Sequence, residues 1–249
     1  MTQFQSLFDF TGKRALITGA ANGIGEAIAR AFVALGAHCL LADQDEAALR
    51  GVAAELAGSS EPLLFDQGEM SSVEALAGAA GNVDLLVNNA GIALRGPLLG
   101  LDLADLRRVV DINLVGPIAL TRMIGATMVS RGSGVVINIS SQMAFVGARD
   151  RSVYASTKSA IAQFTKTAAL EWGPYGIRVN CIAPGRTVTA INRELLGNPS
   201  DYEAGLQRIP LRRYGKVVDI ANTAVFLASP AADYITGQTI IVDGGWVLE

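Results

Sequence analysis

The stretch RALITGAANGIGEAIARAFVALG, residues 14–36, carries an apolar strand directly into a glycine-rich turn and then into an apolar helix. Gly19, Gly23 and Gly25 would allow a tight turn, a close approach of the backbone to a pyrophosphate, and close packing of the helix on the strand. The glycine spacing is G-x-x-x-G-x-G instead of the commoner G-x-G-x-x-G. A glycine-rich turn that binds nothing is the alternative, but the strand–turn–helix context favours a dinucleotide site at Gly19, Asn22, Gly23, Ile24 and Gly25.

Apolar runs of strand length recur along the chain and alternate with stretches of helical periodicity. The runs are RALIT (14–18), HCLLA (38–42), PLLF (62–65), DLLVN (84–88), GVVINIS (134–140), IRVNCIA (177–183) and TIIVD (239–243). Strands that alternate with helices predict βαβ units and a parallel sheet covered on both faces, which also explains why each run is apolar throughout. No linker or composition shift interrupts residues 1–249, so we expect one doubly wound, Rossmann-type α/β domain.

Composition and charge exclude several classes of function. The net charge of -3 and the absence of a basic run argue against a nucleic-acid partner. His38 is the only histidine, so we expect neither a metal site nor a Ser-His-Asp triad. Cys39 and Cys181 lie in apolar runs and are expected to be buried free thiols, as in a reducing compartment. The N-terminus does not resemble a secretory signal and no apolar run reaches about 18 residues, so we expect a soluble cytoplasmic protein without a membrane partner.

The second predicted strand ends in LADQDE, where Asp43 lies about 20 residues beyond the glycine-rich turn. An acidic side chain at this position can accept hydrogen bonds from an adenosine ribose, and it would repel a 2′-phosphate. No Lys or Arg lies between Gly19 and Gly25 or beside Asp43. The pattern favours NAD over NADP, although Asp43 could also simply cap the following helix.

The fourth predicted strand ends in NNAG, Asn88 to Gly91. Ligands bind at the carboxyl ends of strands in an open parallel sheet, near the point where the strand order reverses. Two amides and a glycine at this position suit a cofactor wall lined by backbone. An ordinary strand-ending turn is the alternative.

The segment DRSVYASTK places Tyr154 and Lys158 four positions apart. If residues 153–172 form a helix, the two side chains share one face, with Cβ atoms about 5–6 Å apart. An ammonium beside a phenol favours the phenolate, which would make Tyr154 a usable acid–base group. Ser141, after the fifth strand, could hold a substrate oxygen, and Asn113 could anchor a water. The alternatives are an ordinary surface pair at Tyr154 and a buried, hydrogen-bonded amide at Asn113.

In chain order, TGxxxGIG, NNAG, a central Asn, a Ser, Y-x-x-x-K and the APG at 183–185 make the chain resemble the short-chain dehydrogenase/reductase superfamily. The resemblance runs from Gly12 to the TGQTIIVDGG at 236–245. It implies a seven-stranded parallel sheet with helices on both faces. It also implies a catalytic tetrad of Asn113, Ser141, Tyr154 and Lys158. The cofactor contacts that it implies are Asp66, Asn88, Ala90, Gly91, Tyr154, Lys158, Pro184, Gly185, Thr187 and Thr189.

The same resemblance implies hydride transfer between a nicotinamide and a secondary alcohol or ketone, with Lys158 favouring the Tyr154 phenolate and binding the nicotinamide ribose. The chain departs from the family at Gln67, where members usually carry a smaller apolar residue, and at Thr187, where an aliphatic residue is commoner. Family members usually form homotetramers and less often dimers. The apolar helix IAQFTKTAALEW and the tail GGWVLE are suitable interface surfaces.

Residues 185–215 form a long, polar, arginine-rich excursion, which we expect to be a substrate lid. Arg151 lies three residues before Tyr154, so arginines from both places could converge on one anion. The substrate contacts expected are Ser141, Gln142, Arg151, Tyr154, Arg193 and Arg208. Such arginines, and the DGGW ending, resemble the subgroup of dehydrogenases that act on small hydroxy acids and 2-keto-3-deoxy sugar acids. Solvated surface arginines are the alternative.

The expected function is NAD-dependent oxidation of a secondary alcohol of a small polar, anionic substrate. The alternatives are a neutral polyol or sugar dehydrogenase, a ketoacyl-carrier or steroid reductase, and a dinucleotide-binding redox sensor without activity. Asp43 argues against the ketoacyl reductases, which generally prefer NADP. The intact Ser, Tyr and Lys set argues against a sensor, which need not retain it.

Overall fold

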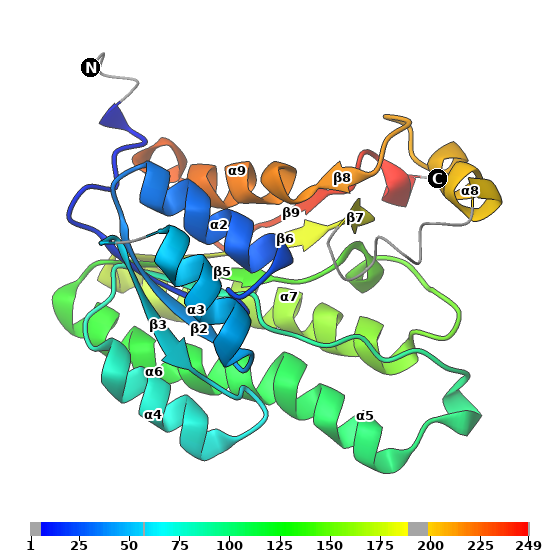
Figure 1. The fold of residues 1–249 in the computed structure, drawn as a ribbon, viewed down its shortest axis with the longest axis horizontal. Coiled ribbons are helices and arrows are strands. Elements are labelled where there is room, and N and C mark those ends of the chain that lie inside the picture. The colour runs from blue at the N-terminus through cyan, green and yellow to red at the C-terminus, as the bar shows by residue number, and fades with distance from the viewer. Residues whose placement is uncertain (1–5, 57, 189–198, 249) are drawn as a thin grey trace.

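The computed structural model describes residues 6–56, 58–188 and 199–248 of the chain. Its centre is a seven-stranded sheet in the order β3-β2-β1-β4-β5-β6-β9, and every neighbouring pair is parallel (Figure 1). All seven predicted strands are therefore confirmed, and so is the predicted sheet. The strands are β1 (Arg14–Thr18), β2 (His38–Asp43), β3 (Ser60–Leu64), β4 (Leu85–Asn88), β5 (Gly134–Ile139), β6 (Ile177–Pro184) and β9 (Thr239–Val242).

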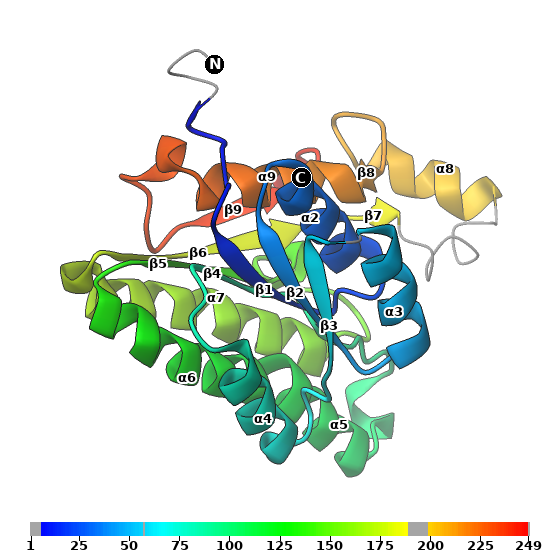
Figure 2. The ribbon, with the colours of Figure 1, turned by 60° about the vertical axis from the view of Figure 1, so that its left-hand side comes forward.

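Helices cover both faces of the sheet, as predicted (Figure 2). One face carries α2 (Gly23–Ala34), α3 (Glu46–Glu55) and α9 (Val217–Ala228). The other carries α4 (Met70–Ala80), α6 (Gly116–Arg131) and α7 (Ser152–Trp172), with α5 (Leu103–Val110) leading into α6 through a π-helical turn at Asp111–Val115.

Two apolar cores explain why the strands are predominantly apolar on both faces. Ile17 of β1 packs into the core beneath α2 and α9, whereas its neighbour Leu16 packs into the core beneath α4 and α6. Both side chains are fully buried. Successive residues of a strand face opposite sides, so both faces of a strand covered on both sides are mostly apolar.

The strand order reverses between β1 and β4, because the chain first builds outward through β2 and β3 and then returns. The loops that leave the carboxyl ends of these two strands diverge there. In an open α/β sheet this divergence creates the ligand-binding crevice.

One helical stretch, Leu103–Arg131, is long and apolar enough to cross a membrane by length and composition, with a mean hydropathy of 1.4. The stretch does not contradict the expectation that no uninterrupted apolar run reaches about 18 residues, because Arg107, Asp111 and Arg122 interrupt it. The hydropathy value refers to an 18-residue segment of this stretch, and half of that segment is buried inside the protein. Leu120, Ile124 and Met128 pack into the core beneath the sheet, so the stretch serves as a core helix.

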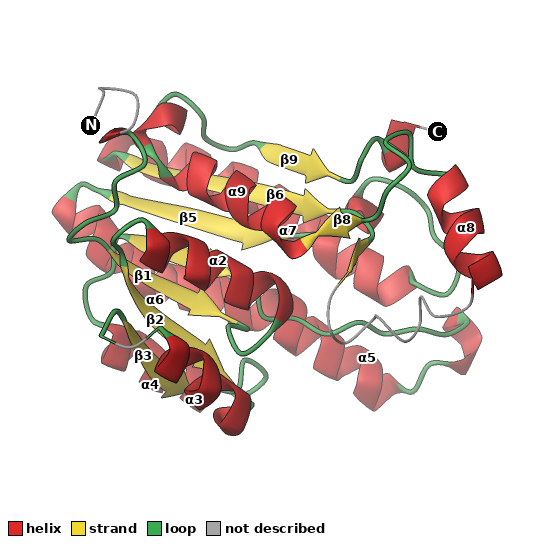
Figure 3. Ribbon diagram, turned by 45° about the horizontal axis from the view of Figure 1, so that its top comes forward, coloured by secondary structure: helices red, strands yellow, loops and turns green. Residues whose placement is uncertain are grey.

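The predicted excursion at 185–215 contains α8 (Pro199–Gln207) and lies beyond the ends to which β5 and β6 point (Figure 3). A short strand at each end, β7 (Thr187–Val188) and β8 (Gly215–Lys216), joins into a parallel pair. The positions predicted at Thr189 and Arg193 lie outside the described residues.

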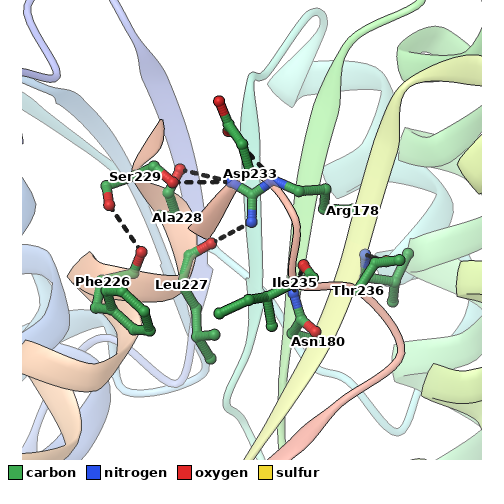
Figure 4. A network of polar contacts seen from close by, with 10 residues as sticks. Arg178, Asn180, Phe226, Leu227, Ala228, Ser229, Asp233, Ile235 and Thr236 are labelled. Carbon is green, nitrogen blue, oxygen red and sulfur yellow. Dashed lines mark hydrogen bonds and ion pairs between the residues drawn. The ribbon is translucent and has the colours of Figure 1, made fainter. Parts of the chain in front are cut away.

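Arg178, near the beginning of β6, anchors the end of α9 (Figure 4). Its guanidinium donates to the carbonyl oxygens of Leu227 at 2.6 Å, Ala228 at 3.1 Å and Ser229 at 3.2 Å. Its Nε lies 3.8 Å from the carboxylate of Asp233. Burial lowers the pKa of Arg178, and the charge of Asp233 acts in the opposite direction. The arginine therefore satisfies carbonyl groups that the end of α9 would otherwise leave unpaired.

Candidate active site

The glycine-rich turn after β1 has the conformation that its sequence requires. Gly19 and Gly23 have φ values of 67° and 60°, in the left-handed region that favours glycine. A Cβ added at Gly25 would collide with the carbonyl oxygen of Gly19, so this glycine allows the predicted close packing of helix and strand. Asn22 precedes α2 but makes no capping hydrogen bond with its side chain. The N–H groups of the first turn of α2 are therefore not occupied by that side chain and suit an anion.

A cavity of about 360 Å³ opens above this turn, at the reversal of strand order. Eight residues predicted at the cofactor line it, among them Gly19, Asn22, Gly23, Ile24, Ala90 and Gly91. The other two are Asp43 and Asp66.

Asp43 is fixed by backbone donors. Its carboxylate accepts from the N–H of Ala21 at 3.0 Å and from the N–H of Asp45 at 3.1 Å. The alternative that Asp43 caps α3 is wrong, because Asp45 is the capping residue and accepts from the N–H of Ala48 at 3.0 Å.

Asn88 requires a correction, because it does not line the cavity. Its amide points into the protein and donates to Thr121 at 2.7 Å and to Asn138 at 2.8 Å. The amide in the cavity wall is that of the next residue, Asn89, the second amide of the NNAG motif. Asn89 donates to the carbonyl oxygens of Thr18 and Gly19, both at 3.0 Å, and so ties the NNAG turn to the glycine-rich turn.

A second cavity, of about 420 Å³, adjoins the first and shares Ile24, Asn89, Gly91 and Ile92 with it. Eight of the predicted residues line it: Ser141, Gln142, Arg151, Tyr154, Lys158, Pro184, Gly185 and Thr187. They come from the ends of β5 and β6 and from the first turns of α7. Residues far apart in sequence therefore meet at one edge of the sheet.

The first turns of α7 carry the Tyr154 and Lys158 pair on one face. The Lys158 ammonium lies 5.9 Å from the centroid of the Tyr154 ring and donates to the carbonyl oxygen of Ile139 at 2.9 Å. Ser140 donates to the carbonyl oxygen of Lys158 at 2.7 Å and joins β5 to α7. Ser141 is buried, and its oxygen accepts from the N–H of Met143 at 3.2 Å. The phenol and the serine hydroxyl thus line one cavity beside a buried cation.

Asn113 lies in the π-helical turn between α5 and α6, and its side chain is fully buried. Its Oδ1 accepts from the N–H of Ile92, and its Nδ2 donates to the carbonyl oxygen of Ile92, both at 2.8 Å. The side chain therefore holds the loop that follows Gly91. Asn113 is thus a buried, hydrogen-bonded amide, which was the alternative interpretation. A π-helical turn within a longer helix is a frequent mark of a functional site.

Arg151 enters the second cavity from the residue before α7. One guanidinium nitrogen, Nη1, is buried and has no hydrogen-bond partner among the described residues. Burial lowers the pKa of Arg151, and the nearby charge of Arg95 lowers it further. The preceding residue, Asp150, has a φ of 60°, a left-handed conformation that few residues other than glycine adopt. A buried donor without a partner, held by a strained turn, is typical of a ligand-binding position.

Arg208 also requires a correction. It is exposed, does not line the cavity of Tyr154, and lies over the ring of Trp246 with 4.6 Å between the guanidinium carbon and the ring centroid. The second arginine of the cavity is instead Arg186, directly after the APG motif. Gln142 is buried, and its Oε1 has no partner in the described part of the chain.

A family model described as Enoyl-(Acyl carrier protein) reductase matches residues 19–247. The chain is 38% identical over 251 residues to a galactitol 2-dehydrogenase (L-tagatose-forming) of Cereibacter sphaeroides, covering 98% of this chain and 99% of that protein. It is 36% identical over 261 residues to a 2-dehydro-3-deoxy-D-gluconate 5-dehydrogenase of Bacillus subtilis, covering 99% of each.

Solved structures are similar over the same length. A gluconate 5-dehydrogenase from Burkholderia cenocepacia J2315, in complex with NADP and tartrate, superposes with a TM-score of 0.91 at 33% identity. The match covers 99% of this chain and all of that one.

Proposed function

The chain belongs to the short-chain dehydrogenase/reductase family, and we propose that it oxidises small anionic alcohols with NAD. The relatives named above are oxidoreductases that act on CH–OH groups. The substrate we propose is a sugar acid or a hydroxy acid with a secondary alcohol. The observation that carries this proposal is the buried, unpartnered Nη1 of Arg151 in the cavity of Tyr154.

The first cavity fits a dinucleotide. Left-handed glycines and the free first turn of α2 suit the pyrophosphate, Asp43 suits a ribose, and Asp66 suits the adenine side. A bound nicotinamide would supply the hydride acceptor for oxidation of the substrate alcohol. The residues proposed to hold it at the second cavity are Lys158 and the APG segment with Thr187.

We propose that NAD is preferred over NADP because the side chains that line the first cavity carry negative charge. Two carboxylates, Asp43 and Asp66, line the first cavity, and no Lys or Arg of the described residues does so. A 2′-phosphate near Asp43 would meet repulsion without a compensating cation. The solved relative named above carries NADP, so the two cofactors must be compared directly.

The proton chemistry falls to the residues around the second cavity. Ser141 positions the substrate oxygen, and Tyr154, as the phenolate, takes the hydroxyl proton as the hydride leaves and becomes a neutral phenol. Lys158, held by its hydrogen bond to the Ile139 carbonyl, stabilises the phenolate before this proton transfer. Asn113 acts as a positioning residue, because it fixes Ile92 in the wall shared by both cavities.

The anionic substrate follows from the lining of the second cavity. Arg151, Lys158 and Arg186 line it, and none of the described lining residues is acidic. A planar guanidinium binds a carboxylate through two parallel hydrogen bonds. The excursion at 185–215 is proposed as the lid over this cavity, with Arg193 as a further contact. The similarity to a sugar-acid dehydrogenase and to the relative that binds tartrate supports an acid.

A neutral polyol is the second candidate, favoured by the similarity to galactitol 2-dehydrogenase. Gln142 would suit it, because a buried amide without a partner can hydrogen-bond a hydroxyl group.

The experiment is NADH formation at mildly alkaline pH with matched acids and polyols, such as gluconate against sorbitol. We expect the acid to be oxidised with the higher kcat/KM. Arg151→Gln should raise KM for the acid by about 10- to 100-fold, because a charge-assisted hydrogen bond is worth about 1.5–3 kcal/mol. Arg50→Gln, which removes a charge from exposed α3, is the control. Polyols oxidised much better than every acid would refute the anionic substrate.

We also propose a homotetramer in the cytoplasm. β9 ends the sheet and has one unpaired edge, and beside it Phe145 and Leu170 are exposed apolar side chains. Such an edge and patch are commonly covered by another chain. A stable monomer at micromolar concentration in light scattering would contradict this assembly.

A further inference from the structure

We propose that Arg186 forms a second anion site in the cavity of Tyr154, so that the substrate carries two anionic groups. This inference rests on the proposed function, which assigns one carboxylate to Arg151. The second group is assigned as another carboxylate, which makes the substrate a small hydroxydicarboxylate.

The lining of the cavity carries more positive charge than is required to neutralise one carboxylate. Arg151 and Arg186 enter it from different parts of the chain, before α7 and after β6, and Arg95 lies near enough to affect Arg151 electrostatically. No acidic side chain of the described residues lines it, although the whole chain has a net charge of -3. A cleft lined by one sign of charge concentrates ligands of the opposite sign.

The guanidinium of Arg186 has no hydrogen bond or ion pair within the described residues, and two nearby carboxylates are already engaged. Arg186 shares a neighbouring cavity with Asp219 and Asp243. Asp219 pairs with Arg213 at 2.7 Å. Asp243 accepts from the N–H groups of Gly245 and Val247, both at 2.8 Å. Neither carboxylate lies within ion-pair distance of Arg186, so its charge is available to a ligand.

The backbone and the packing around Arg186 hold it at this place. Its carbonyl oxygen accepts from the N–H of Gly215 at 2.9 Å, in the short β7–β8 pair. A Cβ added at Gly205 of α8 would lie 2.8 Å from Nη1 of Arg186 and would collide with the hydroxyl of Tyr214. Glycine disfavours a helix, so Gly205 is explained by the room that these two side chains need. The guanidinium therefore lies between the cavity and α8.

The two arginines can be separated by ligands that differ in one group. Glycerate carries one carboxylate, tartrate carries two, 3-phosphoglycerate carries a carboxylate and a phosphate, and erythritol is neutral. Calorimetric titration into the enzyme saturated with NADH measures binding without turnover. We expect tartrate to bind about tenfold more tightly than glycerate, from one additional charge-assisted contact at an exposed arginine.

Arg186→Gln should remove the advantage of tartrate and leave glycerate binding unchanged, whereas Arg151→Gln should weaken both acids. Arg186→Lys keeps the charge without the planar fork, so it should retain part of the advantage. Arg50→Gln is the control for net charge. Thermal unfolding of each variant with NADH shows that it is folded.

Equal binding of glycerate and tartrate to the wild-type enzyme, or equal weakening of both by Arg186→Gln, would overturn the second site while leaving the first carboxylate site intact. Binding of erythritol but of no acid would instead refute the proposed function itself. Tighter binding of 3-phosphoglycerate than of tartrate, lost in Arg186→Gln, would support the second anion site and overturn its assignment to a carboxylate.

Discussion

Arg178→Met should destabilise the protein without affecting its chemistry, because Arg178 lies near the beginning of β6, whereas the cavity of Tyr154 is lined by Pro184 at the end of that strand. Methionine keeps much of the apolar stem and removes three hydrogen bonds to the carbonyl groups at the end of α9. Hydrogen bonds from a charged donor contribute about 1.5–3 kcal/mol each, but losses within one network are not additive.

The expected loss in the free energy of unfolding is about 3 kcal/mol, since the released carbonyl groups partly regain water. The Arg178 side chain is 13% exposed, so little of its hydrogen bonding is already shared with solvent. For a chain of this size, 1 kcal/mol shifts Tm by about 2–4 °C, which gives a decrease of about 6–12 °C.

Asp233→Asn is the matched control. The carboxylate of Asp233 lies 3.8 Å from Arg178 and its side chain is 73% exposed, so the ion pair should contribute less than about 1 kcal/mol. Circular dichroism at one scan rate measures both variants, and kcat at 25 °C should be unchanged in both. A decrease in Tm below 2 °C for Arg178→Met, or an equal decrease for Asp233→Asn, would refute the reasoning.

Three further predictions concern the site and the core. Tyr154→Phe should still bind NADH, measured by fluorescence, yet lose turnover by about 10²–10⁴-fold; near-normal kcat would make the tyrosine structural. Asp43→Ser should narrow the preference for NAD because it removes the repulsion of a 2′-phosphate; a wild-type kcat/KM higher with NADP would contradict this. Burial raises the pKa of Cys39 to about 12 and of Cys181 to about 11, from an ordinary value of 9.0. Both thiols should therefore resist Ellman's reagent at pH 8 until denaturant is added, and stability should fall as pH rises above about 9 because the unfolded thiols ionise first; rapid labelling of the native protein would show that they are accessible.

The strands were predictable because burial on both faces leaves a continuous apolar run. RALIT coincides with β1, and the helix expected at 153–172 begins one residue earlier, at Ser152. The limits of the edge strand were predicted less accurately, because the apolar run at 62–65 corresponds to a strand at Ser60–Leu64. This strand is largely uncovered, so its limits are set by pairing with β2 and not by hydrophobicity.

The site was predictable where a motif fixes both spacing and direction. Tyr154 and Lys158 share a helix face, and the glycine-rich turn follows β1 directly. Asn88 was misplaced because it is still the last residue of β4, where it faces the buried polar pair Thr121 and Asn138. The alternation of a strand could have indicated that its neighbour faces the other way.

The positions of the arginines in the excursion could not be predicted from their distance in sequence to other motifs. Arg186 follows the APG motif immediately, but its position depends on the pairing of β7 with β8, about 28 residues apart in the chain. Arg208 depends on Trp246, close to the C-terminus. Contacts of this kind arise from tertiary packing, which no local pattern in the excursion encodes.

The strained residue before Arg151 also governs how the entrance of the cavity can move. The carbonyl oxygen of Asp150 accepts from the N–H of Gly96 at 3.1 Å, which joins the loop after β4 to the loop before α7. The first loop carries Arg95 and the second carries Arg151, so this bond ties the backbones of the two loops together. The hydrogen-exchange rate of the Gly96 amide therefore reports how often the link between the loops opens. An anion that contacts both loops would stabilise the linked arrangement and slow that exchange.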